Sequence, residues 1–249
     1  MMPLTRNGKI SVHLSEGRNS RVYATPYGEV SKELKYPMDT YSLNRFKEMK
    51  RDYEERLREV GVVFENSRMI CSEKTQKDKF FISLVQKRFS DECVIENLDD
   101  TDPKWDLIFA KLIEVSVRLT DQDKNQLVGI DNRIGNWVFE NGNLILIDIY
   151  PPRIFERGKF YTFSHGNVNE IPLSLIPKEY VEWSVTHKSL FQFRRSIRKR
   201  YVLWERFNDA LENVGINPEQ NSNLKMSFYK SIVGVERNLQ RIWEKMFFG

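Results

Sequence analysis

The sequence contains only two cysteines and three histidines among its 249 residues. Cys71 and Cys93 show no metal-ligand spacing, and the histidines, His13, His165 and His187, are scattered, so neither residue type indicates a metal centre. The apolar runs are short, and none approaches the roughly 20 residues that a membrane-spanning helix requires. The first residues also lack the apolar stretch of a signal peptide. We therefore expect a cytoplasmic protein with reduced cysteines and no membrane span.

The composition is that of a folded globular protein. Hydrophobic residues make up 40% and charged residues 30% of the chain, and a chain of this length can bury a sizeable core. The charge is uneven, because residues 151–249 contain 16 Lys and Arg against 10 Asp and Glu, whereas the rest contains 23 against 25. Positive charge is densest at residues 194–200, Arg-Arg-Ser-Ile-Arg-Lys-Arg.

The most informative segment is residues 129–148. Asp131 and Asn136 stand in a D-x-x-x-x-N frame, and two short apolar runs follow, joined by Asn-Gly at 141–142. Asn-Gly between such runs is a strong β-hairpin signal. The second strand of this hairpin would deliver Asp148 to the end from which Asn136 departs. The pattern therefore predicts that the three polar side chains lie close together.

This set of side chains suits phosphoryl transfer from a nucleotide. We predict that Asp131 takes the proton of an acceptor hydroxyl, and that Asn136 and Asp148 are the hard oxygen ligands of Mg²⁺. Arg133, inside the same loop, either neutralises the transferred phosphate or forms a structural salt bridge. ATP or GTP would be the phosphate donor.

The segment resembles the catalytic region of the protein-kinase-like superfamily, and within it the aminoglycoside phosphotransferase and choline kinase branch. That branch usually has His-Gly before the loop aspartate, whereas residues 129–130 here are Gly-Ile, and Asp148 is followed by Ile-Tyr rather than Phe-Gly. The resemblance implies an α+β, two-lobed kinase-like fold. Residues 1–88 would form a small β-rich N-lobe with one long helix, and residues 89–249 a larger, mostly helical C-lobe.

The same resemblance implies a phosphate cover and a strand lysine near the N-terminus. Residues 15–22 match the kinase glycine-rich frame with serine at two glycine positions, so the nucleotide-binding candidates there are Ser15, Gly17, Ser20 and Val22. Two strands around the turn at 26–28 would place Lys32 against the α- and β-phosphates. Lys35 is the alternative if the strand register shifts.

A helix is predicted over 40–60, because apolar residues recur at three- and four-residue steps and Gly61 follows as a C-cap. In the kinase interpretation this helix carries a glutamate that pairs with Lys32. Glu48 is the first choice, with Glu54 and Glu55 as alternatives. A strand over 79–86 would run into the hinge, so that residues near Gln86 receive the adenine edge.

The rest of the chain is predicted to be largely helical. Helices are expected at 103–119, 178–187, 189–213 and 222–247, with an irregular aromatic segment at 155–163. Because a basic C-lobe does not suit a polycation, the acceptor is expected to be a neutral or anionic small molecule such as a sugar or nucleoside. The alternative is a pseudokinase-like scaffold whose basic helices bind an acidic partner. We do not expect a nucleic-acid partner, and the sequence carries no signal of oligomeric state.

Overall fold

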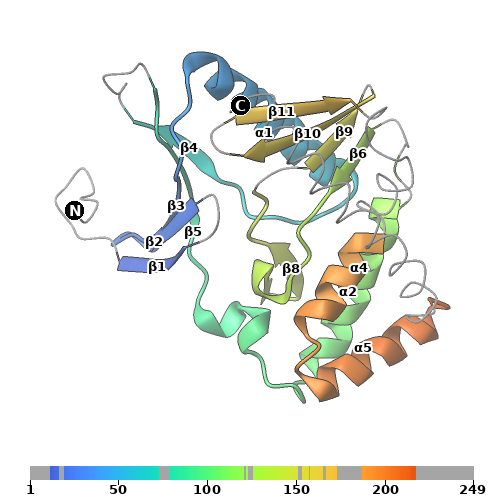
Figure 1. Cartoon of the computed structure of the whole chain (residues 1–249). Helices are drawn as coiled ribbons and strands as arrows, with labels where there is room; N and C mark the ends of the chain where they lie inside the picture. Colours follow the sequence, from blue (N-terminus) through green and yellow to red (C-terminus); the bar gives the residue numbers. More distant parts are fainter. Residues whose placement is uncertain are drawn as a thin grey trace.

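The computed structural model describes residues 12–16, 20–72, 79–120, 122, 126–150, 153–156, 158–164, 167–172 and 187–216. Within these residues the chain has an α+β architecture, as the sequence predicts. It contains three antiparallel sheets and four α-helices (Figure 1). The five-stranded sheet comes first in the chain, followed by a two-stranded hairpin and a four-stranded sheet whose strands flank that hairpin in sequence.

The N-terminal sheet has the strand order β1-β2-β3-β5-β4. Its strands are β1 (Val12–Glu16), β2 (Ser20–Ala24), β3 (Glu29–Leu34), β4 (Arg68–Cys71) and β5 (Ile82–Lys87). The turn between β2 and β3 is tight because Gly28 adopts a φ of 73°, which glycine does at little cost. The register places Val22 and Leu84 on either side of Lys32, so these three side chains share one face of the sheet.

Helix α1 (Thr40–Glu59) confirms the helix predicted over 40–60. Asp39 caps its start, since one carboxylate oxygen accepts a hydrogen bond of 2.7 Å from the backbone N–H of Ser42. The helix is followed by Gly61 with a φ of 73°, where an added Cβ would lie 2.0 Å from the guanidinium of Arg118. The apolar face is buried and includes Leu43, Phe46, Met49, Tyr53 and Leu57.

The predicted hairpin is present as β7 (Trp137–Glu140) and β8 (Asn143–Leu146). Asn141 and Gly142 have φ values of 52° and 75°, the pair of positive φ angles that a two-residue type I′ turn requires. The hairpin follows the short 3₁₀ helix η3 (Ile134–Asn136). The functional candidates therefore lie at the open end of this hairpin.

A second sheet, of order β11-β10-β9-β6, was not predicted. Its strands are β6 (Gln126–Gly129), β9 (Arg153–Glu156), β10 (Lys159–Ser164) and β11 (Asn167–Pro172). The prediction of an irregular segment at 155–163 is therefore wrong. The aromatic residues there favour strands, and Gly158, with a φ of 73°, turns β9 into β10. Helix α1 contacts β6 and β11 of this sheet (Figure 1).

The remaining helices are α2 (Lys104–Thr120), α4 (His187–Ser196) and α5 (Tyr201–Asn213), preceded by the 3₁₀ helices η1 (Asp91–Cys93) and η2 (Ile95–Asn97). Helix α2 confirms the prediction at 103–119. The predicted helix 189–213 is interrupted at 197–200, because Arg200 turns inward and pairs with Asp100 at 2.5 Å. The predicted helix 222–247 lies outside the described residues, as does 178–187 apart from its last residue.

One hydrophobic cluster runs through the described residues, from Leu34 and Met38 near the N-terminal sheet to Phe207 and Leu211 in α5. Helices α2, α4 and α5 pack together around aromatic side chains, and the Phe207 ring lies 5.1 Å from those of Phe109 and Phe193. The division of the chain near residue 88 therefore stays a prediction. Within the described residues, no helix combines the length and the apolar character needed to cross a membrane.

Candidate active site

Lys32 and Asp148, which are 116 residues apart in sequence, meet in an ion pair. The Nζ atom of Lys32 lies 2.5 Å from Oδ1 of Asp148 and also donates a hydrogen bond of 3.2 Å to the backbone carbonyl of Tyr150. The side chains are 19% and 37% exposed, so solvent reaches the carboxylate. Lys35 contacts Glu16 instead, at 2.6 Å. The register of β3 thus directs Lys32, and not Lys35, to Asp148.

Asp131 and Asn136 are joined across their loop. The side-chain amide of Asn136 donates a hydrogen bond of 2.7 Å to the backbone carbonyl of Asp131, and its backbone N–H donates to the carbonyl of Arg133 at 3.0 Å. The carbonyl of Asn136 in turn accepts from the N–H of Ile147 at 2.8 Å. Asn136 therefore lies opposite the residue that precedes Asp148, as the hairpin pattern predicts.

The carboxylate of Asp131 has one oxygen atom without a donor. Its Oδ1 atom is buried and accepts no hydrogen bond from the described residues. The Nε atom of Arg133 lies 3.3 Å away, close enough for an ion pair but without hydrogen-bond alignment, and the Arg133 side chain is 65% exposed. The Asp131 side chain as a whole is 30% exposed, so its carboxylate also presents surface at which a ligand hydroxyl can donate.

Asp148 and Asn136 form a donor set that fits a magnesium–nucleotide complex. They offer one carboxylate and one amide oxygen, and Mg²⁺ in nucleotide sites usually takes one or two protein ligands together with phosphate oxygens and water. Among the described side chains, no cluster of three or more His, Cys, Asp or Glu suggests a metal held by protein alone.

The expected partner of Lys32 on helix α1 needs correction. Glu48 is 51% exposed and pairs with Arg45 at 2.8 Å, one helical turn earlier. Of the two alternatives, Glu54 pairs with Lys50 at 2.5 Å and Glu55 is exposed. The reason is the orientation of the helix. Its apolar residues occupy the buried face, so its glutamates point toward solvent or toward basic residues of the same helix.

The predicted phosphate cover is described only in part. Ser15 lies opposite Val22, and Val22 lies opposite Lys32, so these three residues form one row across the sheet. Ser20 is buried and lies opposite Leu34 at the end of β2. Gly17 lies outside the described residues. Of the four residues predicted to cover the phosphates, Val22 is therefore the neighbour of Lys32, and Ser15 lies one strand further along the same row.

Gln86 takes a position that the sequence did not reveal. Its side-chain amide donates a hydrogen bond of 2.9 Å to the backbone carbonyl of Ile147, immediately before Asp148. That residues near Gln86 receive the adenine edge stays a prediction. No sequence pattern signals a bond from a side chain to a distant backbone carbonyl, so this contact could not be foreseen.

Tyr150 was also missed as a site residue. Its carbonyl binds Lys32, and the lysine Nζ lies 5.6 Å from the centre of its ring. The ring packs edge-on against Phe46 of α1, with 5.2 Å between ring centres, and burial raises the pKa of the phenol well above its ordinary value. Tyr150 thus links the ion pair to the helix. The only sequence signal is an aromatic residue soon after Asp148.

The chain belongs to a family of unknown function, DUF6206, whose family model matches residues 28–187. The matched region contains Lys32, Asp131, Asn136 and Asp148. No curated protein matches the chain. Among solved structures it is similar to WaaP in complex with acyl carrier protein, with 13% identity over 95% of this chain and 88% of that chain and a TM-score of 0.39. A likeness this weak carries no conclusion about activity.

Proposed function

We propose that this protein is a kinase-like, Mg²⁺-dependent phosphotransferase that moves the γ-phosphate of ATP or GTP to a hydroxyl group of a small molecule. The observation that carries the proposal is the 2.5 Å contact between Lys32 and Asp148. A strand lysine and an aspartate from distant parts of the chain meet beside the loop that carries Asp131 and Asn136. This combination provides one cation for phosphate, two oxygen ligands for a metal and one carboxylate for a hydroxyl.

Each residue has a distinct task in binding the donor. Lys32 leaves the carboxylate and contacts the α- and β-phosphates as a point charge. Asp148 and Asn136 hold Mg²⁺, which when bound offsets negative charge on the phosphates. Ser15 and Val22 cover the phosphates from the sheet side, and Gly17 is proposed to act with them.

Asp131 and Arg133 act on the transferred group. The carboxylate of Asp131, whose side chain is 30% exposed, accepts a hydrogen bond from the acceptor hydroxyl and orients its oxygen toward the γ-phosphorus. As the new O–P bond forms, the bond from phosphorus to the bridging oxygen breaks and its electron pair leaves with the nucleoside diphosphate. Asp131 takes the hydroxyl proton late in this step, and Arg133 of the same loop neutralises the transferred phosphoryl oxygens.

The acceptor is proposed to be neutral or anionic, and the support comes from the charge of α4 and the turn after it. Arg195, Arg198 and Lys199 are exposed there. Arg200, in contrast, is held by Asp100, so it does not add to the free positive charge. A polycationic acceptor would meet repulsion at such a surface. Sugars, sugar phosphates and nucleosides are the compounds to test.

The test compares wild type with Asp148→Asn and Asp131→Asn in thermal unfolding and in phosphate transfer. Nucleotide with Mg²⁺ at about 100 times its Kd should stabilise wild type by about 2.7 kcal/mol, a Tm rise of roughly 5 to 10 °C. Asp148→Asn should lose this rise, because the metal loses its carboxylate. Asp131→Asn should keep it but lose transfer to any acceptor that wild type phosphorylates, since only the proton acceptor is changed.

Samples with EDTA separate metal-dependent binding from binding to phosphate alone. A rise that persists in EDTA would contradict the metal assignment of Asp148. Full turnover in Asp131→Asn would contradict its catalytic role. No rise with either nucleotide in folded wild type would overturn the proposal and favour a scaffold that binds an acidic partner through its basic helices.

A further inference from the structure

A buried polar network lies directly beneath the loop that carries Asp131. Asn132 is fully buried, and its Oδ1 accepts a hydrogen bond of 2.6 Å from the indole N–H of Trp137. Its amide donates to the hydroxyl of Ser189 at 2.9 Å, and that hydroxyl lies 3.2 Å from the hydroxyl of Ser116. Ser116 donates to the carbonyl of Leu112 at 2.8 Å. The hydrogen bonds therefore run in one direction, from Asn132 through both serines to helix α2.

Helix α4 supplies further contacts to the same loop. The backbone N–H of Asn132 donates to the side-chain carbonyl of Gln192 at 3.3 Å, and that of Ile134 donates to the hydroxyl of Ser196 at 3.1 Å. Ser189, Gln192 and Ser196 recur at three- and four-residue steps, so they form one polar stripe on the helix. This stripe bonds both the side chain and the backbone of the loop.

Packing alone does not explain an amide at this position. A buried polar group is costly unless it is hydrogen-bonded, whereas an apolar side chain of similar volume needs no partners. The network satisfies both polar atoms of the Asn132 side chain with groups from two separate segments, Trp137 of β7 and Ser189 of α4. Such an arrangement fixes the loop in one orientation rather than merely filling space.

We infer that Asn132 is a positioning residue, which holds the loop so that Asp131 faces the acceptor and Asn136 faces Asp148. The inference rests on the proposed phosphotransfer for its kinetic consequence, but the anchoring of the loop is a property that can be measured without turnover. Asn132 itself touches neither donor nor acceptor. It acts through Ser189, Trp137 and the backbone on either side of it.

The experiment uses two variants of the full chain and one control. Ser189→Ala removes the acceptor of the Asn132 amide with a minimal change in volume. Asn132→Leu removes both side-chain hydrogen bonds of this residue, to Ser189 and from Trp137. Ile108→Val, in the buried part of α2 away from the loop, is a control for loss of stability. If Asn132→Leu fails to fold, Ser189→Ala against Ile108→Val still decides the question.

Two readouts are compared. In hydrogen exchange followed by mass spectrometry, peptides that contain residues 131–136 should exchange ~10-fold faster in Ser189→Ala than in Ile108→Val. In kinetics, kcat should fall by ~10- to 100-fold while KM for the nucleotide changes little, because displacement of the loop harms transfer more than donor binding. Unchanged exchange in the loop would overturn the inference, even in an active enzyme. So would an equal fall of kcat in the control.

Failure of the proposed function gives a different result. If wild type transfers phosphate to no acceptor while Ser189→Ala still loosens the loop, the anchoring stands and the phosphotransferase proposal falls. If wild type is active and the loop variants match the control in both readouts, the positioning role falls and the proposed function stands.

Discussion

At the scale of single residues, the proposed function sets Lys32 and a metal ion in competition for the same carboxylate. The ammonium lies 2.5 Å from Asp148, where a bound metal would also have to approach. Nucleotide phosphates resolve this competition, because they offer Lys32 a new partner and bring the metal with them. A free metal ion must displace the lysine without that compensation.

This competition predicts opposite effects of Lys32→Met on two ligands. Electron paramagnetic resonance measures free Mn²⁺ and so gives the affinity of the protein for this ion. That affinity should rise by about 1.5- to 5-fold, because the metal no longer has to break a partly exposed ion pair worth about 0.2–1 kcal/mol. Affinity for Mg²⁺–nucleotide should fall by about 10- to 100-fold, because a hydrogen bond to a charged group contributes about 1.5–3 kcal/mol. Both changes follow from removing the same positive charge.

Lys35→Met is the matched control for this comparison. Lys35 follows the same strand but pairs with Glu16 and not with Asp148. It should leave both affinities within about twofold of wild type, since a change away from the site has a small effect. Weaker Mn²⁺ binding in Lys32→Met would mean that the lysine assists rather than opposes metal at Asp148.

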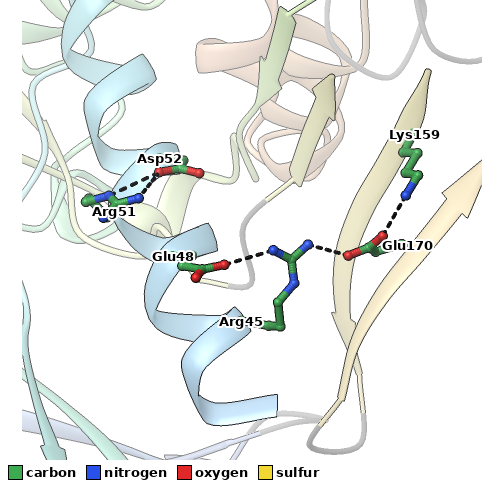
Figure 2. Close-up of polar contacts among 6 residues, drawn as sticks. All are labelled: Arg45, Glu48, Arg51, Asp52, Lys159 and Glu170. Carbon is green, nitrogen blue, oxygen red and sulfur yellow. Dashed lines mark hydrogen bonds and ion pairs between the residues drawn. The ribbon is translucent and has the colours of Figure 1, made fainter. Parts of the chain in front are cut away.

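At the scale of elements, helix α1 is tied to the second sheet by a row of alternating charges. Glu48 pairs with Arg45, Arg45 with Glu170 of β11, and Glu170 with Lys159 of β10, as Figure 2 shows. A second ion pair joins Arg56 to β9. These ion pairs hold α1 against the second sheet, through β11 and β9, and explain why Glu48 is turned toward Arg45 and not toward Lys32.

The pKa of Glu170 makes this bridge sensitive to acid. The hydrogen bond from Lys159, and then that from Arg45, hold the pKa of Glu170 below its ordinary value of 4.5 against the opposing effect of burial. The stabilisation is therefore fully present above the ordinary pKa and is lost as the pH falls through the lower pKa of the folded state. Glu170→Gln should lower the free energy of unfolding by about 0.2–1 kcal/mol near neutral pH, and by less as the pH falls below about 4.

Urea unfolding at several pH values checks this dependence. Glu55→Gln, which changes an exposed glutamate of helix α1, should stay within about 0.5 kcal/mol of wild type near neutral pH. A deficit in Glu170→Gln that grew on acidification would show that the folded state raises rather than lowers the pKa of this carboxyl.

The elements that local patterns specify were predictable, and those that depend on distant partners were not. Asn141-Gly142 favours a two-residue hairpin turn, and apolar residues at three- and four-residue steps in 40–60 favour a helix. Both elements could therefore be predicted from the sequence. The break at Arg200 depends on Asp100, which is far away in sequence. The contact of Gln86 with Ile147 and the anchoring of Asn132 likewise join segments that no short pattern connects. Sequence patterns thus predict the contact region of Asn136 and Asp148, whereas the partners of Glu48 and Gln86 come only from the folded chain.

At the scale of the whole molecule, one core connects the two predicted parts of the chain. Met38, fully buried beside the N-terminal sheet, belongs to the same cluster as Phe207 of α5. Tyr53 of α1 donates a buried hydrogen bond of 2.9 Å to the carbonyl of Gly129, close to the loop that carries Asp131. A continuous core of this kind favours unfolding as one unit, because neither part can open without exposing the other.

The tryptophans allow a direct test of this cooperativity. All five lie after residue 88, so their fluorescence reports the C-terminal part. Met38→Ala changes the N-terminal part and should cost about 2–5 kcal/mol, or roughly 4 to 20 °C in Tm. If the core is cooperative, the fluorescence midpoint should fall together with the midpoint of far-ultraviolet circular dichroism.

Tyr41→Ala is the control in the N-terminal part. Because Tyr41 is 73% exposed, this change should leave both midpoints nearly unchanged. If Met38→Ala lowered the circular dichroism midpoint alone, the two parts would unfold separately. The contact between Lys32 and Asp148 would then join two independent units, and nucleotide binding would have to hold them together. Coincident shifts would instead mean that the core fixes the ion pair before any ligand arrives.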